Sequence, residues 1–129
     1  MLSSINPSTG ELIREYPETS ALEQENLLRA AAAAFRQWKL SSFEERSERL
    51  LAARQVLLAK KEKLARLMTQ EMGKPIVQAR TEIEKCALGC EFYARNGAKF
   101  LAPEEVATDA RRSYVSFEPL GVVLAVMPW

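Results

Sequence analysis

The chain has 129 residues, of which 47% are hydrophobic and 27% are charged, and its 18 Lys and Arg against 17 Asp and Glu give a net charge of +1. This length fits one domain, and the composition is typical of a soluble globular protein. The balanced charge excludes a global basic surface for nucleic acid and a polybasic membrane patch, and the longest apolar run is too short to cross a bilayer, so we expect neither partner.

The residue types also limit the chemistry and the compartment. The chain has no histidine, which removes Ser-His-Asp and Cys-His catalysis and most zinc sites, so we predict neither a catalytic residue nor a metal ligand. Cys86 and Cys90 are too few for a disulfide framework, and no secretory signal precedes them. We therefore expect reduced thiols and a cytoplasmic protein. On a helix, the two cysteines are predicted to be small buried hydrophobes, with a redox or metal role as the alternative.

The first segment predicts a turn inside a hairpin. Residues 4–11 contain Asn-Pro followed by Ser-Thr-Gly, which is typical turn chemistry. Residues 11–16 alternate weakly between apolar and polar, as in a short strand. We expect Ile5 to pair with the region of Leu12 and Ile13.

Two helical runs follow the hairpin. Ser20 stands three residues before Glu23, the spacing of a capping box, and opens a helix that we end near Leu40. Its apolar residues recur on one side at helical spacing, and they are Leu27, Leu28, Ala31, Ala34, Phe35 and Trp38. Residues 43–72 form the second run, with a break predicted near Lys60 because helices longer than about 25 residues are unusual. Its leucine pairs also suggest a coiled coil, but the run is short, so core packing is favoured.

A stop and a restart separate this run from a third helix. Gly73 fits the left-handed position after a helix end, and Pro75 fits the first turn of the next helix. Lys74, between them, is expected to be solvated. The third helix is predicted over residues 76–101. Its expected buried face comprises Ile76, Ala79, Ile83, Cys86 with Ala87, Cys90, Tyr93 and Ala94.

The last part of the chain changes from polar to apolar. Residues 103–110 are loop-like, and residues 113–117 alternate as a strand does. Residues 121–127 are continuously apolar and rich in β-branched side chains, which predicts a strand buried on both faces and ended by Pro128. Ligands of open α/β sheets bind beyond the carboxyl ends of strands, so Trp129 is either core or close to a ligand.

Together these segments resemble the amino-terminal part of the aldehyde dehydrogenase superfamily. The resemblance rests on N-P-x-T-G-E at residues 6–11, E-x-G-K-P at 71–75, E-P-L-G-V at 118–122 and P-W at 128–129. Residues 80–87, 92–94 and 124–129 look most like succinate-semialdehyde dehydrogenases. The resemblance implies an α/β, aldehyde dehydrogenase-like fold. Residues 1–129 are then the amino-terminal portion of its dinucleotide-binding domain: the helical layer and the first strands, without the catalytic domain.

The resemblance also implies an activity. A full-length member oxidises succinate semialdehyde or a similar small aldehyde to the acid with NAD or NADP, and assembles as a dimer or tetramer. Four residues match the family segment that borders the nicotinamide-ribose part of the cofactor, and they are Val126, Met127, Pro128 and Trp129. The family's asparagine, glutamate and nucleophilic cysteine come later, and Cys86 and Cys90 do not match the nucleophile's motif. We therefore expect residues 1–129 alone to be inactive.

Two other interpretations remain open at the level of the sequence. The helical run of residues 43–72 would offer its leucine face to a partner if the protein were an interaction module. An inactive aldehyde dehydrogenase remnant would keep the scaffold for assembly.

Overall fold

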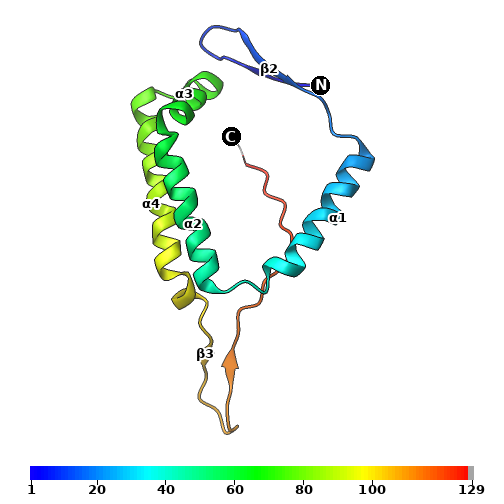
Figure 1. Cartoon of the computed structure of the whole chain (residues 1–129), viewed down its shortest axis with the longest axis vertical. Coiled ribbons are helices and arrows are strands. Elements are labelled where there is room, and N and C mark those ends of the chain that lie inside the picture. The colour runs from blue at the N-terminus through cyan, green and yellow to red at the C-terminus, as the bar shows by residue number, and fades with distance from the viewer. Residues whose placement is uncertain (128–129) are drawn as a thin grey trace.

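The computed structural model describes residues 1–127 and is open rather than spherical (Figure 1). Three helices pack together on one side, a fourth stands apart, and a two-stranded ribbon projects from the far end. The elements in chain order are β1 (Leu2–Ile5), β2 (Leu12–Tyr16), α1 (Ala21–Trp38), α2 (Phe43–Ala59), α3 (Lys61–Met72), α4 (Ile76–Phe100), β3 (Glu104–Glu105) and β4 (Tyr114–Val115). Over the described residues, none of these helices has both the length and the apolar character needed to cross a membrane.

The predicted amino-terminal hairpin is confirmed. β1 and β2 pair antiparallel, with Leu2 opposite Tyr16 and Ile5 opposite Leu12. The turn between them is closed by a hydrogen bond from the Asn6 amide to the Glu11 carbonyl at 2.9 Å. The Asn6 side-chain oxygen also accepts from the Ser8 amide at 2.9 Å, as asparagine does in such turns.

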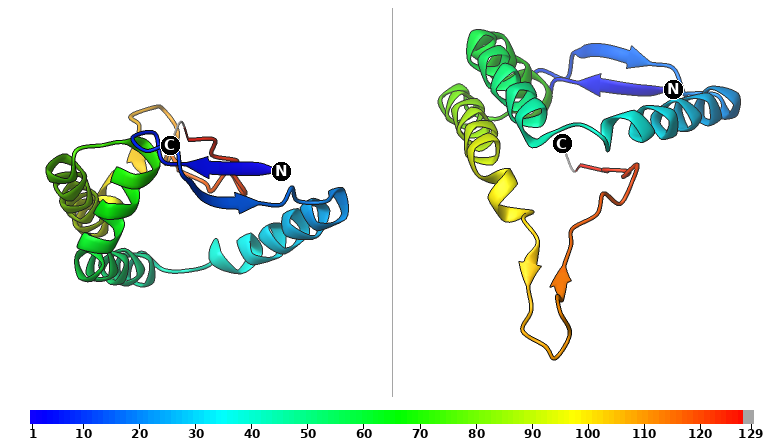
Figure 2. Two further views of the ribbon diagram at one scale, coloured as in Figure 1. Left: turned by 90° about the horizontal axis from the view of Figure 1, so that it is seen from above. Right: turned by 60° about the horizontal axis from the view of Figure 1, so that its bottom comes forward.

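The start of α1 follows its local sequence, but its apolar face has no cover. The capping box is present: the Ser20 hydroxyl accepts from the Glu23 amide, and the Glu23 carboxylate accepts from the Ser20 amide. However, α1 contains no buried residue, and Leu27 and Leu28 are 64% and 65% exposed. Figure 2 shows the reason, because α1 extends away from the three packed helices.

The small core lies where α4 packs against α2 and α3. The predicted break is confirmed, since α2 ends at Ala59 and α3 begins at Lys61. This break and the packing on α4 favour ordinary core packing over the coiled coil. The buried residues of the described chain are Ala65, Ala79, Ile83 and Ala87. Their small side chains allow the helices to approach closely.

Polar contacts also hold α2 against α4. The Ser47 hydroxyl donates to the Ala94 carbonyl at 2.9 Å. The Arg54 Nε lies 3.0 Å from a carboxylate oxygen of Glu91, and both side chains are largely shielded. These contacts join residues more than thirty positions apart in the sequence, so they belong to the tertiary structure.

The junction between α3 and α4 agrees closely with the sequence. Gly73 ends α3 in the left-handed conformation with φ of 70°, as predicted. Pro75 is the N-cap of α4, one position earlier than the first turn. Two residues of the predicted buried face are instead exposed: Cys86, and Tyr93 at 60%. The buried stripe of α4 recurs every four residues through Ala79, Ile83 and Ala87, and these two side chains fall outside it.

The predictions for the last segment are only partly correct. Within the predicted loop, β3 pairs antiparallel with β4, and β4 is shorter than predicted. The buried strand predicted for residues 121–127 is wrong for this structure, because these residues are irregular and Leu124 is 87% exposed. A buried strand needs hydrogen-bonded neighbours, and no segment among residues 1–127 pairs with this one.

Candidate functional site

The candidate cofactor segment leaves β4 and returns past the link between α1 and α2 (Figure 1). Within this segment, Gly121 has a φ of 119°, a value that is unfavourable for a residue with a side chain. A Cβ at this position would lie 3.9 Å from the Phe35 ring of α1. The glycine therefore allows this backbone conformation beside α1.

A hollow of about 360 Å³ lies where this segment begins. Phe117, Glu118 and Pro119 line one side, and the α1–α2 link lines the other. Arg46 organises that link: its Nε donates to the Ser41 hydroxyl at 2.9 Å and its Nη2 to the Lys39 carbonyl at 3.3 Å.

Sequence reasoning did not single out Arg46. The guanidinium also lies over the Phe43 ring, 5.5 Å from its centroid, a distance typical of a cation–π contact. The sequence did contain a signal for Arg46. It follows the N-cap Ser42 by one helical turn, and every group that it contacts is close to it in the sequence.

The predicted cofactor residues are not gathered into a pocket. Val126 and Met127 are 83% and 73% exposed. Pro128 and Trp129 lie outside the described residues. The contact of this segment with a cofactor therefore stays a prediction.

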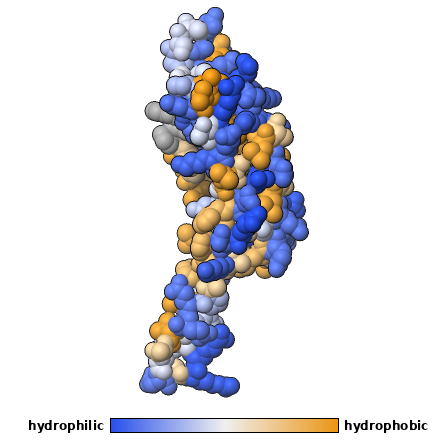
Figure 3. Space-filling view, turned by 90° about the vertical axis from the view of Figure 1, so that its left-hand side faces the viewer, coloured by the Kyte–Doolittle hydropathy of each residue, from blue (hydrophilic) through white to orange (hydrophobic). Residues whose placement is uncertain are grey.

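A larger and shallower hollow of about 740 Å³ lies along α4. Cys86 lines it as an exposed free thiol, and Cys90 is half-buried. Lys74 also lines it and forms an ion pair with Glu82, so the expectation of a solvated lysine was wrong. Figure 3 shows hydrophilic residues interrupting the hydrophobic patches on the face that lies at the left-hand side of Figure 1. Within residues 1–127, no group of three or more His, Cys, Asp or Glu could hold a metal ion.

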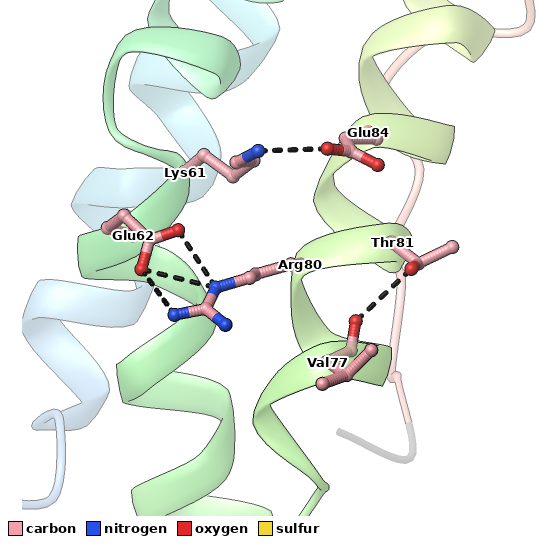
Figure 4. Close-up of polar contacts among 6 residues, drawn as sticks. All are labelled: Lys61, Glu62, Val77, Arg80, Thr81 and Glu84. Atoms are coloured by element: carbon pink, nitrogen blue, oxygen red, sulfur yellow. Dashed lines mark hydrogen bonds and ion pairs between the residues drawn. The ribbon is translucent and has the colours of Figure 1, made fainter.

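The charged residues between α3 and α4 are engaged with one another (Figure 4). The Arg80 guanidinium donates to both carboxylate oxygens of Glu62, with two contacts of 2.9 Å. The Lys61 Nζ donates to Glu84 at 2.9 Å. The hydrogen bond from Arg80 lowers the pKa of Glu62 below its ordinary value of 4.5, and the same contact raises the pKa of Arg80. Glu62 is thus held as a paired carboxylate, which suits interhelical packing rather than proton transfer.

The comparison with known families decides the identity. The model of the aldehyde dehydrogenase family matches residues 1–129. The chain belongs to the aldehyde dehydrogenase family. The predicted resemblance, which rested on several short motifs in the correct order, is confirmed.

Two relatives show which members the chain resembles in sequence. It is 41% identical over 126 residues to succinate semialdehyde dehydrogenase (NAD(P)+) Sad of Escherichia coli K12, covering 98% of this chain and 27% of that protein. It is also 41% identical over 128 residues to a probable succinate-semialdehyde dehydrogenase (NADP(+)) of Synechocystis, covering 99% of this chain and 28% of that protein. The chain therefore spans a little over a quarter of the length of these relatives.

Solved structures confirm the fold class. The structure of Gox0499 superposes with a TM-score of 0.88 at 27% identity, covering 93% of this chain and 27% of that one. The succinic semialdehyde dehydrogenase of Streptococcus pyogenes, solved with NADP+, superposes with a TM-score of 0.81 at 26% identity, covering 87% of this chain and 25% of that one. The described helices and strands are consistent with the amino-terminal part of an aldehyde dehydrogenase-like α/β fold.

Proposed function

We propose that this chain is the amino-terminal part of an NAD(P)-dependent aldehyde dehydrogenase that oxidises succinate semialdehyde to the acid. The observation that carries the proposal is the 41% identity to two proteins named for this activity, over 98% and 99% of the chain. In this proposal, α2, α3 and α4 form a packed helical layer, and the segment after Gly121 reaches the cofactor.

Val126, Met127, Pro128 and Trp129 are the proposed contacts to the nicotinamide-ribose part of NAD or NADP. The high exposure of Val126 and Met127 supports this role, because neither side chain is used by the helical core. Uncharged side chains fit the edge of a nicotinamide and its ribose, but they offer no charge for the phosphates. They therefore fit a border of the cofactor and not its whole site.

The bound nicotinamide supplies the hydride acceptor, and the work of this chain is to hold the border of that site in place. The backbone conformation of Gly121 and the link held by Arg46, which lines the same hollow as the start of the segment, support this role. Cys86 and Cys90 lie on α4 and are not assigned as nucleophiles. We therefore propose that residues 1–129 alone do not oxidise aldehydes.

A chimera tests the proposed role of these residues. The matched part of the Escherichia coli relative is replaced by this chain, and NAD(P)H formation is followed with succinate semialdehyde. We expect activity from the chimera and none from residues 1–129 alone. A chimera with parental circular dichroism and assembly but no activity would contradict the proposal, and NAD(P)H formation by the 129 residues would contradict their inactivity.

The substrate and cofactor need a separate measurement on the native-length polypeptide. Its rates with succinate semialdehyde and with a short uncharged aldehyde are compared, each with NAD+ and with NADP+. We expect the highest kcat/KM with succinate semialdehyde. A native-length polypeptide inactive with every pair would favour the remnant interpretation.

Assembly and compartment complete the proposal. We propose a homo-oligomer, a dimer or tetramer, for the native-length polypeptide, which sedimentation of that polypeptide measures. The free thiols of Cys86 and Cys90 support a reducing compartment such as the cytoplasm. Fractionation of cells that express the protein tests this location.

A further inference from the structure

Two family motifs that are far apart in the sequence meet in the structure. The first is the turn of residues 6–11, called here the opening turn, and the second is the α3–α4 junction at Gly73. Figure 2 shows the hairpin that carries the opening turn lying beside the end of α3. Neither motif takes part in the cofactor segment, so their contact calls for a separate explanation.

Two independent features favour glycine at residue 73. Its φ of 70° is a conformation that side chains disfavour. In addition, a Cβ at this position would lie 3.2 Å from the Pro7 Cγ and 4.0 Å from the Ser8 hydroxyl. The first distance is shorter than normal van der Waals contact, so Pro7 would have to move by a few tenths of an ångström to admit a side chain at residue 73.

A hydrogen bond provides a second connection. The Ser4 hydroxyl of β1 donates to the Glu71 carboxylate at 2.9 Å, across 67 positions of sequence. The opening turn is itself well defined, because the Gly10 amide donates to the Asn6 carbonyl at 2.8 Å. A turn held in one conformation can transmit a contact at its tip to the strands that it joins.

We propose that the contact of the opening turn with Gly73 couples the amino-terminal hairpin to the α3–α4 junction, so that the two unfold locally as one cooperative unit. A junction built from glycine and proline has few hydrogen bonds of its own and would otherwise open locally at low cost. Because of this contact, local unfolding of the junction also requires the loss of the Pro7 and Ser4 contacts. The inference concerns conformational coupling and does not depend on the proposed activity.

Hydrogen exchange in the native-length polypeptide tests this coupling. The reporters are the Gly73 amide, bonded to the Thr69 carbonyl, and the Ala79 amide, bonded to the Pro75 carbonyl. Gly73→Asn keeps a residue that tolerates left-handed φ but adds a side chain against Pro7. We expect it to accelerate exchange of both reporters and of the β1 amides by about tenfold, within the range for contacting residues.

A double-mutant cycle separates the contact from the backbone effect. In a Pro7→Ala background, Gly73→Asn has space, so its effect should be smaller by about threefold or more. The matched control is Gly121→Asn, because Gly121 also has a positive φ, of 119°, but lies outside the hairpin and the junction, and its added Cβ would meet only the Phe35 ring, at 3.9 Å. We expect this control to change exchange at the Gly73 amide by less than about twofold.

Each outcome bears on the proposal. Faster hydrogen exchange in both the junction and the hairpin, with a smaller effect in the Pro7→Ala background, supports the proposed coupling. Equal effects of Gly73→Asn in both backgrounds, acceleration confined to the junction, or an equal effect of Gly121→Asn overturns it. Because the readout is exchange and not turnover, failure here leaves the proposed dehydrogenase function unaffected.

Discussion

The exposed terminal segment predicts that the 129-residue chain associates with itself. Residues 120–127 carry no charge, and Leu120 and Leu124 are 97% and 87% exposed. An unpaired apolar segment with high strand propensity is a site for pairing between copies. We therefore expect Leu124→Glu to weaken this association, because a charge in such a segment opposes pairing.

The size of the effect follows from the exposed area. Full burial of a leucine side chain stabilises by about 1.5–3 kcal/mol. Since 87% of Leu124 is exposed, covering it in an associated form contributes about 1.3–2.6 kcal/mol per copy. At about 1.4 kcal/mol per tenfold change, the concentration needed for association should rise about ten- to eightyfold in the variant.

Sedimentation velocity over a concentration series measures this change. The matched control is Val77→Glu, since Val77 is an apolar residue with 68% exposure but lies in α4, whose helical backbone does not pair as a strand. We expect the control to associate like the unmodified chain. The reasoning fails if Leu124→Glu and Val77→Glu shift association equally, or if the unmodified chain remains monomeric at every concentration.

Two further predictions concern the helical core. Ile83→Ala truncates a side chain that is only 7% exposed, so it should lower the free energy of unfolding by about 2–4 kcal/mol. Urea unfolding in the Leu124→Glu background measures this loss. A loss below about 1 kcal/mol would show that the interface around Ile83 is loosely packed. The folded-state pKa of Glu62 is lowered, so its contact with Arg80 contributes stability above the ordinary pKa of 4.5, and this contribution is lost as the pH falls through the lower folded value. In Arg80→Gln the Glu62 titration followed by NMR should return toward the ordinary value, and an unchanged midpoint would show that Arg80 is not the cause.

Local signals in the sequence were sufficient for most helix boundaries. A capping box depends on residues three positions apart, so Ser20 and Glu23 identify the start of α1 without tertiary information. Gly73 marks the end of α3 for a similar reason, because its backbone conformation is a local property. The family also followed from short motifs in a fixed order, which the family match over residues 1–129 confirms.

Which side chains are covered was decided only by the tertiary structure. Periodicity placed Cys86 and Ala87 together on one face of α4, yet only Ala87 is buried, because the partner helices cover a stripe narrower than the apolar pattern. The contact between Pro7 and Gly73 likewise joins positions with no relation in the sequence. The composition of residues 121–127 determined that the segment is apolar, but strand formation depends on hydrogen-bonded neighbours, which the described residues do not provide.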